Sequence, residues 1–442
     1  MPIRMSALMR PFEDFFKSQV AGGILLLAAT LVALVLANSP AGPAYHGFWH
    51  IKIGLTIGHA NFELPLHYWI NDGLMAVFFF VVGLEIKREL LAGELAAPTQ
   101  AALPIAAALG GMVVPALIYL GTNLGRPTLS GWGIPMATDI AFALGVIALL
   151  GDRIPRSLAI FLTALAIVDD LGAVLVIALF YTGELNPTAL WLAAGLFALL
   201  VVGSRIGIQT LPFYLLFGLL LWLALLSSGI HASITGILVG AVIPVRPRHN
   251  HAQFLASADT LMAHYLRHED EPGPFQRESR LGTLLALEHV CHDAMSPLQR
   301  IEHSLHPWVI YGVMPVFALA NAGVRVRAAG LPEALAEPVT AGVGLGLLLG
   351  KPLGIFLFSW LAVRCGVARL ANDLAWKDIV GAGFLAGIGF TMSIFITALA
   401  FGSTPAAPAA KIGIFAGSLL AGGIGYLLLR RRPLPMTDRP VP

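Results

Sequence analysis

The sequence predicts an all-α polytopic membrane protein with about 12 transmembrane helices. Of its 442 residues, 57% are hydrophobic and only 12% are charged, whereas charged residues make up about 25% of a typical soluble domain. The mean hydropathy is +0.80. The 47 Gly and 29 Pro residues lie inside apolar runs without a collagen-like period, so fibrous and disordered classes are excluded as well.

The composition and motifs also exclude several classes of function. The two cysteines, Cys291 and Cys365, provide neither a disulfide framework nor a cysteine-based zinc site. The chain contains no GxxxxGK[ST] loop, so an ATP-driven pump is not expected. The net charge of +2 gives no reason to expect a nucleic-acid partner. Residues 1–17 do not have the features of a signal peptide and are expected to form a cytoplasmic N-terminal segment.

Twelve apolar windows are long enough to cross about 30 Å of hydrocarbon as helices. They are residues 18–37, 66–86, 101–121, 131–150, 157–181, 188–204, 211–226, 230–243, 307–323, 338–363, 378–400 and 410–429. If the N-terminus is inside, 21 of the 27 Lys and Arg residues fall in inside segments and 5 in outside segments. The excess of inside cations predicts that both termini are cytoplasmic.

Two longer segments lie outside these windows. Residues 45–65 alternate polar and apolar side chains around Gly58, which predicts a small external β-hairpin. Residues 246–306 form a large cytoplasmic loop that carries 8 of the 13 histidines. A Pro-Gly-Pro break at 272–274 is followed there by an apolar stripe at Leu281, Leu284, Leu285 and Leu287, typical of an amphipathic helix.

Asp169 and Asp170 are adjacent in the window 157–181, roughly 18 Å from either end of the helix and thus near the midplane. Intramembrane ionisable side chains cost free energy and commonly mark a transport path. Two carboxylates this close resist joint ionisation, so one is expected to exchange protons. The pair suits a monovalent cation or a proton, although an intramembrane Asp can also serve only in an interhelical hydrogen bond.

Lys351 is a third ionisable residue near the midplane, in the window 338–363. A buried lysine either loses its proton or pairs with a carboxylate. Asp169 and Asp170 are the candidates for this pairing, and the alternative to a functional role is a structural ion pair.

Two windows contain residues that interrupt helices. Gly131, Gly133 and Pro135 precede Thr138 and Asp139, and glycines at 381–389 precede Thr391 and Ser393. Broken helices expose dipole ends that require compensation. Asp139 is therefore expected to face helix N-termini and Lys351 to face C-termini. The glycines could instead serve only close packing, but their matching places in the fourth and eleventh windows favour two inverted three-helix units.

Several motifs together resemble one known family, the NhaA-type bacterial sodium/proton antiporters. They are residues 71–79 (NDGLMAVFF), 82–90 (VGLEIKREL), 137–145 (ATDIAFALG), 166–172 (AIVDDLG), 229–232 (GIHA), 305–308 (LHPW), 350–354 (GKPLG) and 386–393 (AGIGFTMS). The resemblance covers nearly the whole chain. It departs from the family in the loop 246–306, which is enlarged here.

The resemblance implies a single transporter domain over residues 1–442, with an inverted-repeat core at 101–181 and 338–429 and two crossed discontinuous helices. The general rule for such repeats is drawn partly from this family, so it adds no independent support. Asp169 and Asp170 are implied to bind transported Na+, with Lys351 as a further proton or ion site and Thr138 and Asp139 along the ion path.

Four residues match positions linked in the family to pH response at the cytoplasmic entrance: Glu85, Arg88, His231 and Glu302. Each could instead be a solvated charge, and Glu288 sits in a second copy of the Glu-His motif that surrounds Glu302. The motif at 305–308 favours Glu302.

The predicted function is electrogenic, pH-regulated exchange of cytoplasmic Na+ or Li+ for external H+, for sodium and pH homeostasis. The expected protein is a transporter and not an enzyme, needs no resident cofactor, contacts membrane lipid, and forms a homodimer in the bacterial inner membrane. A sodium-coupled symporter of an organic solute, a channel, and a subunit of a proton-pumping complex are the alternatives.

Overall fold

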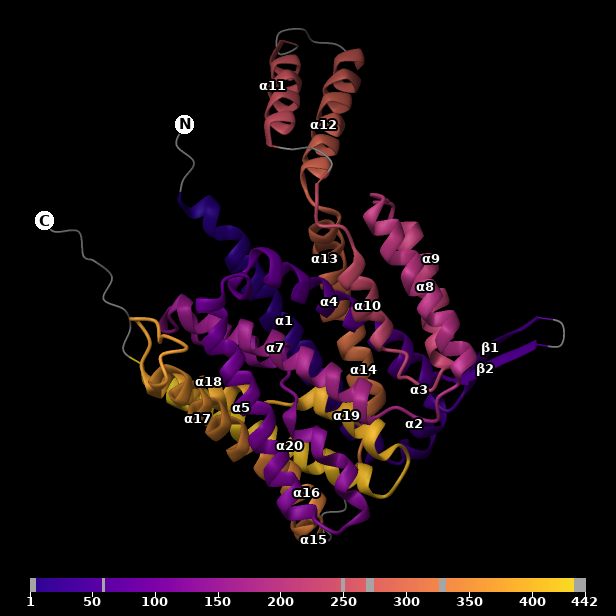
Figure 1. Ribbon diagram of the computed structural model, residues 1–442, viewed down its shortest axis with the longest axis vertical. Coiled ribbons are helices and arrows are strands. Elements are labelled where there is room, and N and C mark those ends of the chain that lie inside the picture. The colour runs from indigo at the N-terminus through magenta and orange to yellow at the C-terminus, as the bar shows by residue number, and fades with distance from the viewer. Residues whose placement is uncertain (1–4, 58–59, 248–250, 268–273, 326–330, 433–442) are drawn as a thin grey trace, which may run out of the picture.

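The computed structural model describes residues 5–57, 60–247, 251–267, 274–325 and 331–432, and these are mostly helical (Figure 1). The expected turn at Gly58 and most of the Pro-Gly-Pro break lie outside the described residues. The helices of the first half are α1 (Met5–Ala37), α2 (Gly42–Trp49), α3 (Leu66–Tyr68), η1 (Trp69–Leu74), α4 (Met75–Ala92), α5 (Pro98–Asn123), η3 (Pro127–Met136), α6 (Ile140–Leu150), α7 (Arg156–Phe180), α8 (Pro187–Arg205), α9 (Leu211–Leu226) and α10 (Ile234–Val242).

The second half begins with a hairpin of two helices and ends with a helix of 25 residues. Its helices are α11 (His251–Arg267), α12 (Pro274–Ala294), α13 (Pro297–Trp308), η5 (Val309–Val313), α14 (Met314–Asn321), α15 (Leu331–Ala336), α16 (Pro338–Leu345), η7 (Gly346–Gly350), α17 (Lys351–Arg364), α18 (Trp376–Ala386), α19 (Phe390–Phe401) and α20 (Ala406–Arg430).

Eight of the described helical stretches are long and apolar enough to cross a membrane, or nine if the bent pair α18 and α19 forms one span. The other three predicted spans coincide with α9 of 16 residues, α10 of 9 residues, and the stretch from the last two residues of α13 through η5 and α14. The chain therefore has the predicted helical class, and the count of twelve stays a prediction.

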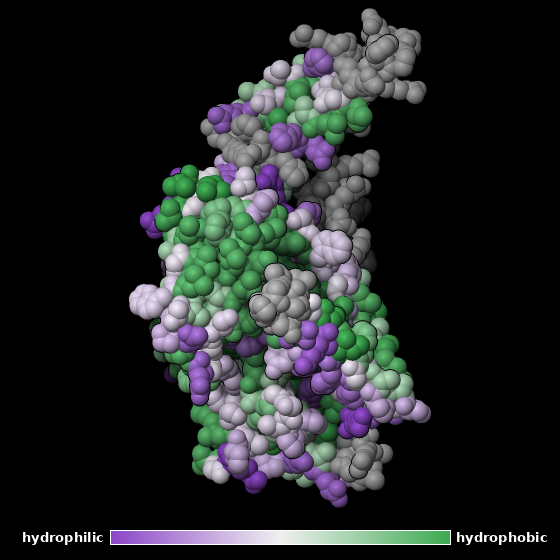
Figure 2. Space-filling view, turned by 90° about the vertical axis from the view of Figure 1, so that its right-hand side faces the viewer, coloured by the Kyte–Doolittle hydropathy of each residue, from purple (hydrophilic) through white to green (hydrophobic). Residues whose placement is uncertain are grey.

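The small β-hairpin is confirmed. Strands β1 (Lys52–Ile57) and β2 (Ala60–Pro65) pair in antiparallel register, with Lys52 opposite Pro65. The predicted range of 45–65 was too long at its start, because residues up to Trp49 form α2. Figure 2 looks onto the side from which the hairpin projects, and much of the surface there is hydrophobic. Helices α8 and α9 supply exposed apolar side chains such as Trp191, Leu192 and Leu216, as expected of a lipid-facing surface.

The loop 246–306 contains more helix than the sequence analysis expected. Helices α11 and α12 form a hairpin that projects from the body of the molecule (Figure 1). Within the predicted stripe, Leu281, Leu284 and Leu285 are exposed. The next helix, α13, returns to the body, where it packs on α4.

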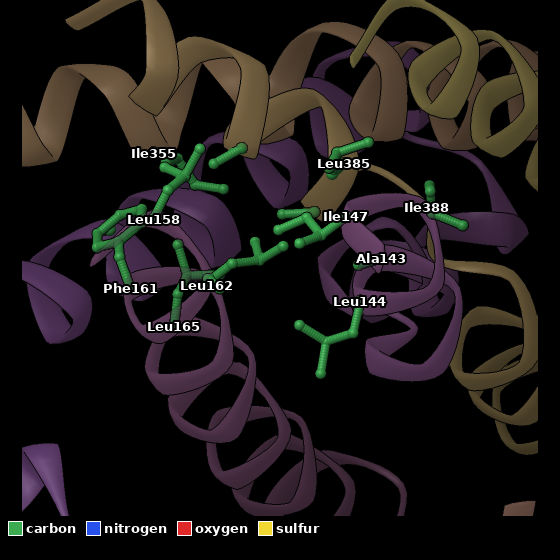
Figure 3. Packing of buried hydrophobic residues seen from close by; sticks show 14 of the residues in the cluster. Ala143, Leu144, Ile147, Leu158, Phe161, Leu162, Leu165, Ile355, Leu385 and Ile388 are labelled. Atoms are coloured by element: carbon green, nitrogen blue, oxygen red, sulfur yellow. The ribbon is translucent and has the colours of Figure 1, made fainter. Parts of the chain in front are cut away.

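One face of α7 continues directly from the hydrophobic core into the predicted ion site. Leu158, Leu162 and Leu165 follow each other at helical spacing and are fully buried beside Ile355 of α17 and residues of α6 and α18 (Figure 3). Asp169 comes four residues after Leu165, and Lys351 comes four residues before Ile355, so each lies one turn farther along the same helix face. Packing of these apolar turns thus aligns the two charged residues.

Helix α5 packs against both α17 and α7. Glycines permit the contact with α17, because a Cβ added at Gly110 would overlap the carbonyl oxygen of Gly354, and a Cβ added at Gly354 would overlap that of Gly110. The two backbones therefore touch at this crossing. Close approach of small residues is a common means of helix association in membranes.

Gly110→Ala should lower the free energy of unfolding by about 1–3 kcal/mol, the usual cost of overpacking. Thermal unfolding of the detergent-solubilised protein measures this. Gly121→Ala on the same helix is the control, since a Cβ there meets no atom within 4 Å, and its expected effect is neutral or stabilising. Equal stability of both variants would contradict the close crossing.

Candidate ion-binding site

The two aspartates lie in the interior of the membrane-spanning helix α7. Asp169 and Asp170 are each 1% exposed, and Asp169 lies 13 residues after the first residue of the helix, Arg156. Because neighbouring residues of a helix point about 100° apart, their carboxylates face different neighbours. The two carboxylates are thus buried within the protein on different sides of α7.

Lys351 is completely buried, and it is in contact with Asp169. Its Nζ donates to Asp169 Oδ2 at 2.5 Å and to Thr138 Oγ1 at 2.7 Å. The lysine follows a π-helical turn, η7, and such turns frequently occur at functional sites. The predicted pairing of Lys351 with a carboxylate is thus present in the structure, and its partner is Asp169.

The other carboxylate oxygens of the aspartate pair accept no hydrogen bond from the described residues. Among the described residues, neither oxygen of Asp170 has a hydrogen-bond partner, and Oδ1 of Asp169 has none. A buried carboxylate without a partner is costly, and it is relieved by a proton or a cation. No group of three or more His, Cys, Asp or Glu side chains suited to a metal occurs among the described residues. The carboxylate oxygens without a partner here belong to the aspartate pair.

The two predicted helix breaks are present and touch each other. Residues 137–139 are extended between η3 and α6, and residues 387–389 separate α18 from α19, which are bent by 48°. The Asp139 N–H donates to the carbonyl of Ile388 at 2.6 Å, and the Thr138 hydroxyl donates to the carbonyl of Ala386 at 2.9 Å. Each break therefore satisfies backbone groups exposed by the other.

Asp139 caps two helix N-termini at once. Its Oδ1 accepts the N–H of Phe142 in α6 at 3.3 Å, and its Oδ2 accepts the N–H of Thr391 in α19 at 3.1 Å and the Thr391 hydroxyl. A carboxylate is favourable at the positive end of a helix dipole. The expectation that Asp139 faces helix N-termini agrees with these contacts.

Lys351 does not hydrogen-bond a helix C-terminus directly. It reaches one through Thr138, which accepts from Lys351 and donates to Ala386, the last residue of α18. The simple expectation of a lysine facing C-terminal carbonyls thus requires correction, because the threonine hydroxyl stands between the charge and the carbonyl.

Two serines hydrogen-bond further backbone groups at the breaks. The Ser418 hydroxyl of α20 accepts the N–H groups of Gly389 at 3.2 Å and Phe390 at 3.4 Å, and Ser393 donates to the carbonyl of Ile134 at 2.8 Å. Ser393 lies within a motif noted in the sequence. Nothing in the sequence singles out Ser418, because a single serine in a Gly-rich apolar helix is common.

Three of the four predicted pH-response residues lie in one cluster. Arg88 pairs with Glu302 and, at 3.1 Å, with Glu89, while Glu85 lies 3.7 Å from Nε2 of His306. Burial raises the pKa of the Glu302 carboxyl, and the Arg88 guanidinium opposes that shift. Of the two copies of the Glu-His motif, the one in α13 brings its glutamate, Glu302, back to α4.

His231 does not belong to this cluster, so the structure brings together only three of the four candidates. Its Nε2 lies 3.2 Å from Asp72 Oδ1, and its Nδ1 lies 2.7 Å from the Ser233 hydroxyl. Asp72 and Glu85 are 13 residues apart along η1 and α4, which corresponds to roughly 20 Å of helix. A sequence motif alone contains no information on this separation.

Membrane-crossing helices that break where buried ionisable side chains meet define a secondary transporter of small ions. The sequence model described as Na+/H+ antiporter 1 matches residues 13–429. The chain belongs to this sodium/proton antiporter family, and it is a multi-pass membrane protein.

Curated relatives match nearly the full chain. The chain is 59% identical to Na(+)/H(+) antiporter NhaA 2 of Syntrophotalea carbinolica, covering 98% of each chain. It is 51% identical to Na(+)/H(+) antiporter NhaA of Acidithiobacillus ferrooxidans, covering 96% of this chain and 97% of the relative. A solved structure of the sodium proton antiporter MjNhaP1 from Methanocaldococcus jannaschii is 13% identical, with a TM-score of 0.47 over 96% of this chain and 99% of that one, a likeness too low to bear on the fold.

Asp139→Ala should destabilise the protein by about 1–4 kcal/mol, because it removes the acceptor for two helix N-termini at about 0.5–2 kcal/mol each. Asp139→Asn is the matched variant, since it keeps one acceptor oxygen, enough for one of the two helix N-termini, and replaces the other oxygen with an NH2 group. Its loss should be smaller. Thermal unfolding in detergent compares the two, and identical, wild-type stability of both would contradict the double cap.

Proposed function

We propose that this antiporter exchanges cytoplasmic Na+ or Li+ for external H+, with net charge movement, at Asp169 and Asp170. The observation that carries the proposal is the buried aspartate pair, in which three of the four carboxylate oxygens have no partner among the described residues. Such oxygens bind either a proton or a small hard cation. Because both ligands use the same oxygens, binding of one expels the other, which is the chemistry of antiport.

Lys351 makes this exchange electrogenic. In our proposal the lysine pairs with Asp169 when sodium is absent, and sodium breaks that pair on arrival. The lysine then loses its counter-charge and releases a proton. A competing account keeps Lys351 as a structural ion pair, with both carried protons on the aspartates. The 2.5 Å contact between Nζ and Oδ2 is compatible with either account.

Alternating access would come from movement of the core, residues 101–181 and 338–429, against the other helices. The two broken spans, Thr138 and Asp139 belong to this core, so the site and its dipole compensation move together. We place the protein in the bacterial inner membrane with both termini cytoplasmic, acting in sodium and pH homeostasis. Glu85, Arg88 and Glu302 are proposed to tune activity with pH as one cluster, and His231 as a separate pair with Asp72.

Asp170→Asn should abolish sodium-dependent proton movement, because an amide cannot carry the exchanged proton or provide the charge that attracts sodium. Proteoliposomes with an internal pH dye and sodium as the only added cation make the measurement. A symporter or channel would give no sodium-driven pH change in this assay. Asp152→Asn, at an exposed acid after α6, is the control. Normal exchange by Asp170→Asn would overturn the assignment.

Lys351→Gln tests the two roles of the lysine. It preserves much of the bulk and the hydrogen bonding but cannot titrate. We expect any remaining exchange to become electroneutral and insensitive to an imposed membrane potential. Lys377→Gln, at an exposed lysine, should remain electrogenic. A sodium-dependent current from Lys351→Gln in reconstituted membranes would leave Lys351 with the structural role only.

Deletion of residues 50–64 should weaken a homodimer and leave transport by each protomer intact. The hairpin has exposed strand edges that can pair with a second copy, whereas Asp169, Asp170 and Lys351 lie within one chain. Light scattering of the purified protein measures the oligomeric state, and proteoliposomes measure exchange. An unchanged dimer, or a folded variant without transport, would contradict this proposal.

A further inference from the structure

An apolar groove of 480 Å³ lies between α5 and η3, on the outside of the predicted core. Its lining is apolar except for one serine: Met112, Val113, Ala116, Leu117, Leu120, Leu129, Ser130, Trp132 and Met136. Both walls belong to membrane-crossing stretches of the chain. Hydrocarbon is therefore the medium that surrounds this groove.

The groove has a buried floor and exposed walls. Met112, Ala116 and Met136 form the floor and are each less than 9% exposed, whereas Leu117 is 60% exposed. From Met112 to Leu120 the helix rises by about 12 Å. The groove thus runs from near the end of α5 toward the middle of the membrane, which suits an extended hydrocarbon chain.

A single cation stands at the outer end of the groove. Arg126 is the only charged residue between Glu94 and Asp139. It lies one turn from the lining, since the Leu129 N–H donates to the Arg126 carbonyl at 3.2 Å. The side chain is exposed, and no carboxylate among the described residues forms an ion pair with it. Arginine is well suited to bind phosphate.

We propose that this groove binds one acyl chain of an anionic phospholipid, whose phosphate pairs with Arg126. The shape, the apolar lining and the membrane position select the acyl chain, and the isolated arginine at the mouth selects a negative headgroup. The groove shares no residue with the proposed ion site.

The deep end of the groove connects it to the ion site. Met112 packs on Gly172 of α7, where an added Cβ would overlap the methionine sulfur, and Gly172 is two residues after Asp170. Met136 directly precedes the extended segment that contains Thr138 and Asp139. A bound chain would therefore support both walls of the ion site from the lipid side.

Trp132 provides a probe inside the groove, because bromine on an acyl chain quenches indole fluorescence on contact. The protein is placed in phosphatidylcholine nanodiscs that contain a minor fraction of brominated phosphatidylglycerol or, in parallel, brominated phosphatidylcholine. The difference between the wild type and Trp132→Phe isolates the signal of Trp132 from those of the other seven tryptophans.

We expect the brominated anionic lipid to quench Trp132 at about five-fold lower mole fraction than the brominated phosphatidylcholine, the preference that one cation near an anionic lipid supports. Arg126→Gln should remove this preference, and Ala116→Phe, which fills the floor, should reduce quenching by both lipids. Leu109→Phe, on the exposed side of α5 outside the lining, should leave both the quenching and the lipid preference unchanged. Equal quenching by the two lipids in the wild type, or an undiminished preference in Arg126→Gln, would show ordinary surrounding lipid and overturn the site.

Discussion

A lysine and an aspartate that are both buried in an apolar interior stay charged only by pairing with an opposite charge, and the rest of the site is arranged around the pairing of Lys351 with Asp169. Lys351 and Asp169 are fully buried and 2.5 Å apart. Removing one partner of a buried pair typically costs about 3–5 kcal/mol. The apolar turns that precede Asp169 and follow Lys351 bring the two side chains together, and the glycine crossing of α5 and α17 brings α17 close enough for the contact.

The broken helices follow from the same constraint. A buried polar cluster between membrane-crossing helices requires further polar groups, and a broken helix supplies them as free N–H and C=O groups. Here these groups are satisfied mutually: Asp139 caps α6 and α19, Ser418 caps α19, and Thr138 links Lys351 to the end of α18. The Asp170 carboxylate does not take part in this network, and neither of its oxygens has a hydrogen-bond partner among the described residues.

Much of this could be predicted from the sequence because lipid tolerates few charges. The burial of Asp169, Asp170 and Lys351 follows from the length of the apolar windows, and the two breaks follow from Gly and Pro placement. The hairpin follows from the alternation of polar and apolar side chains. Other features depend on tertiary contacts that no local pattern encodes. Which aspartate pairs with Lys351 depends on the rotation of α7, the role of Ser418 depends on a contact 29 residues away, and the separation of His231 from Glu85 depends on where the turn before α10 lies against η1.

The most direct test of the account is proton release on sodium binding. The purified protein in weakly buffered detergent solution, with a pH indicator, is mixed with sodium chloride or with choline chloride as the control salt. Competition for the aspartate oxygens predicts saturable acidification with sodium only, at lower sodium concentration as the starting pH rises. Sodium that is retained by the protein, as measured with radioactive sodium, without any proton release at any pH would contradict the shared site.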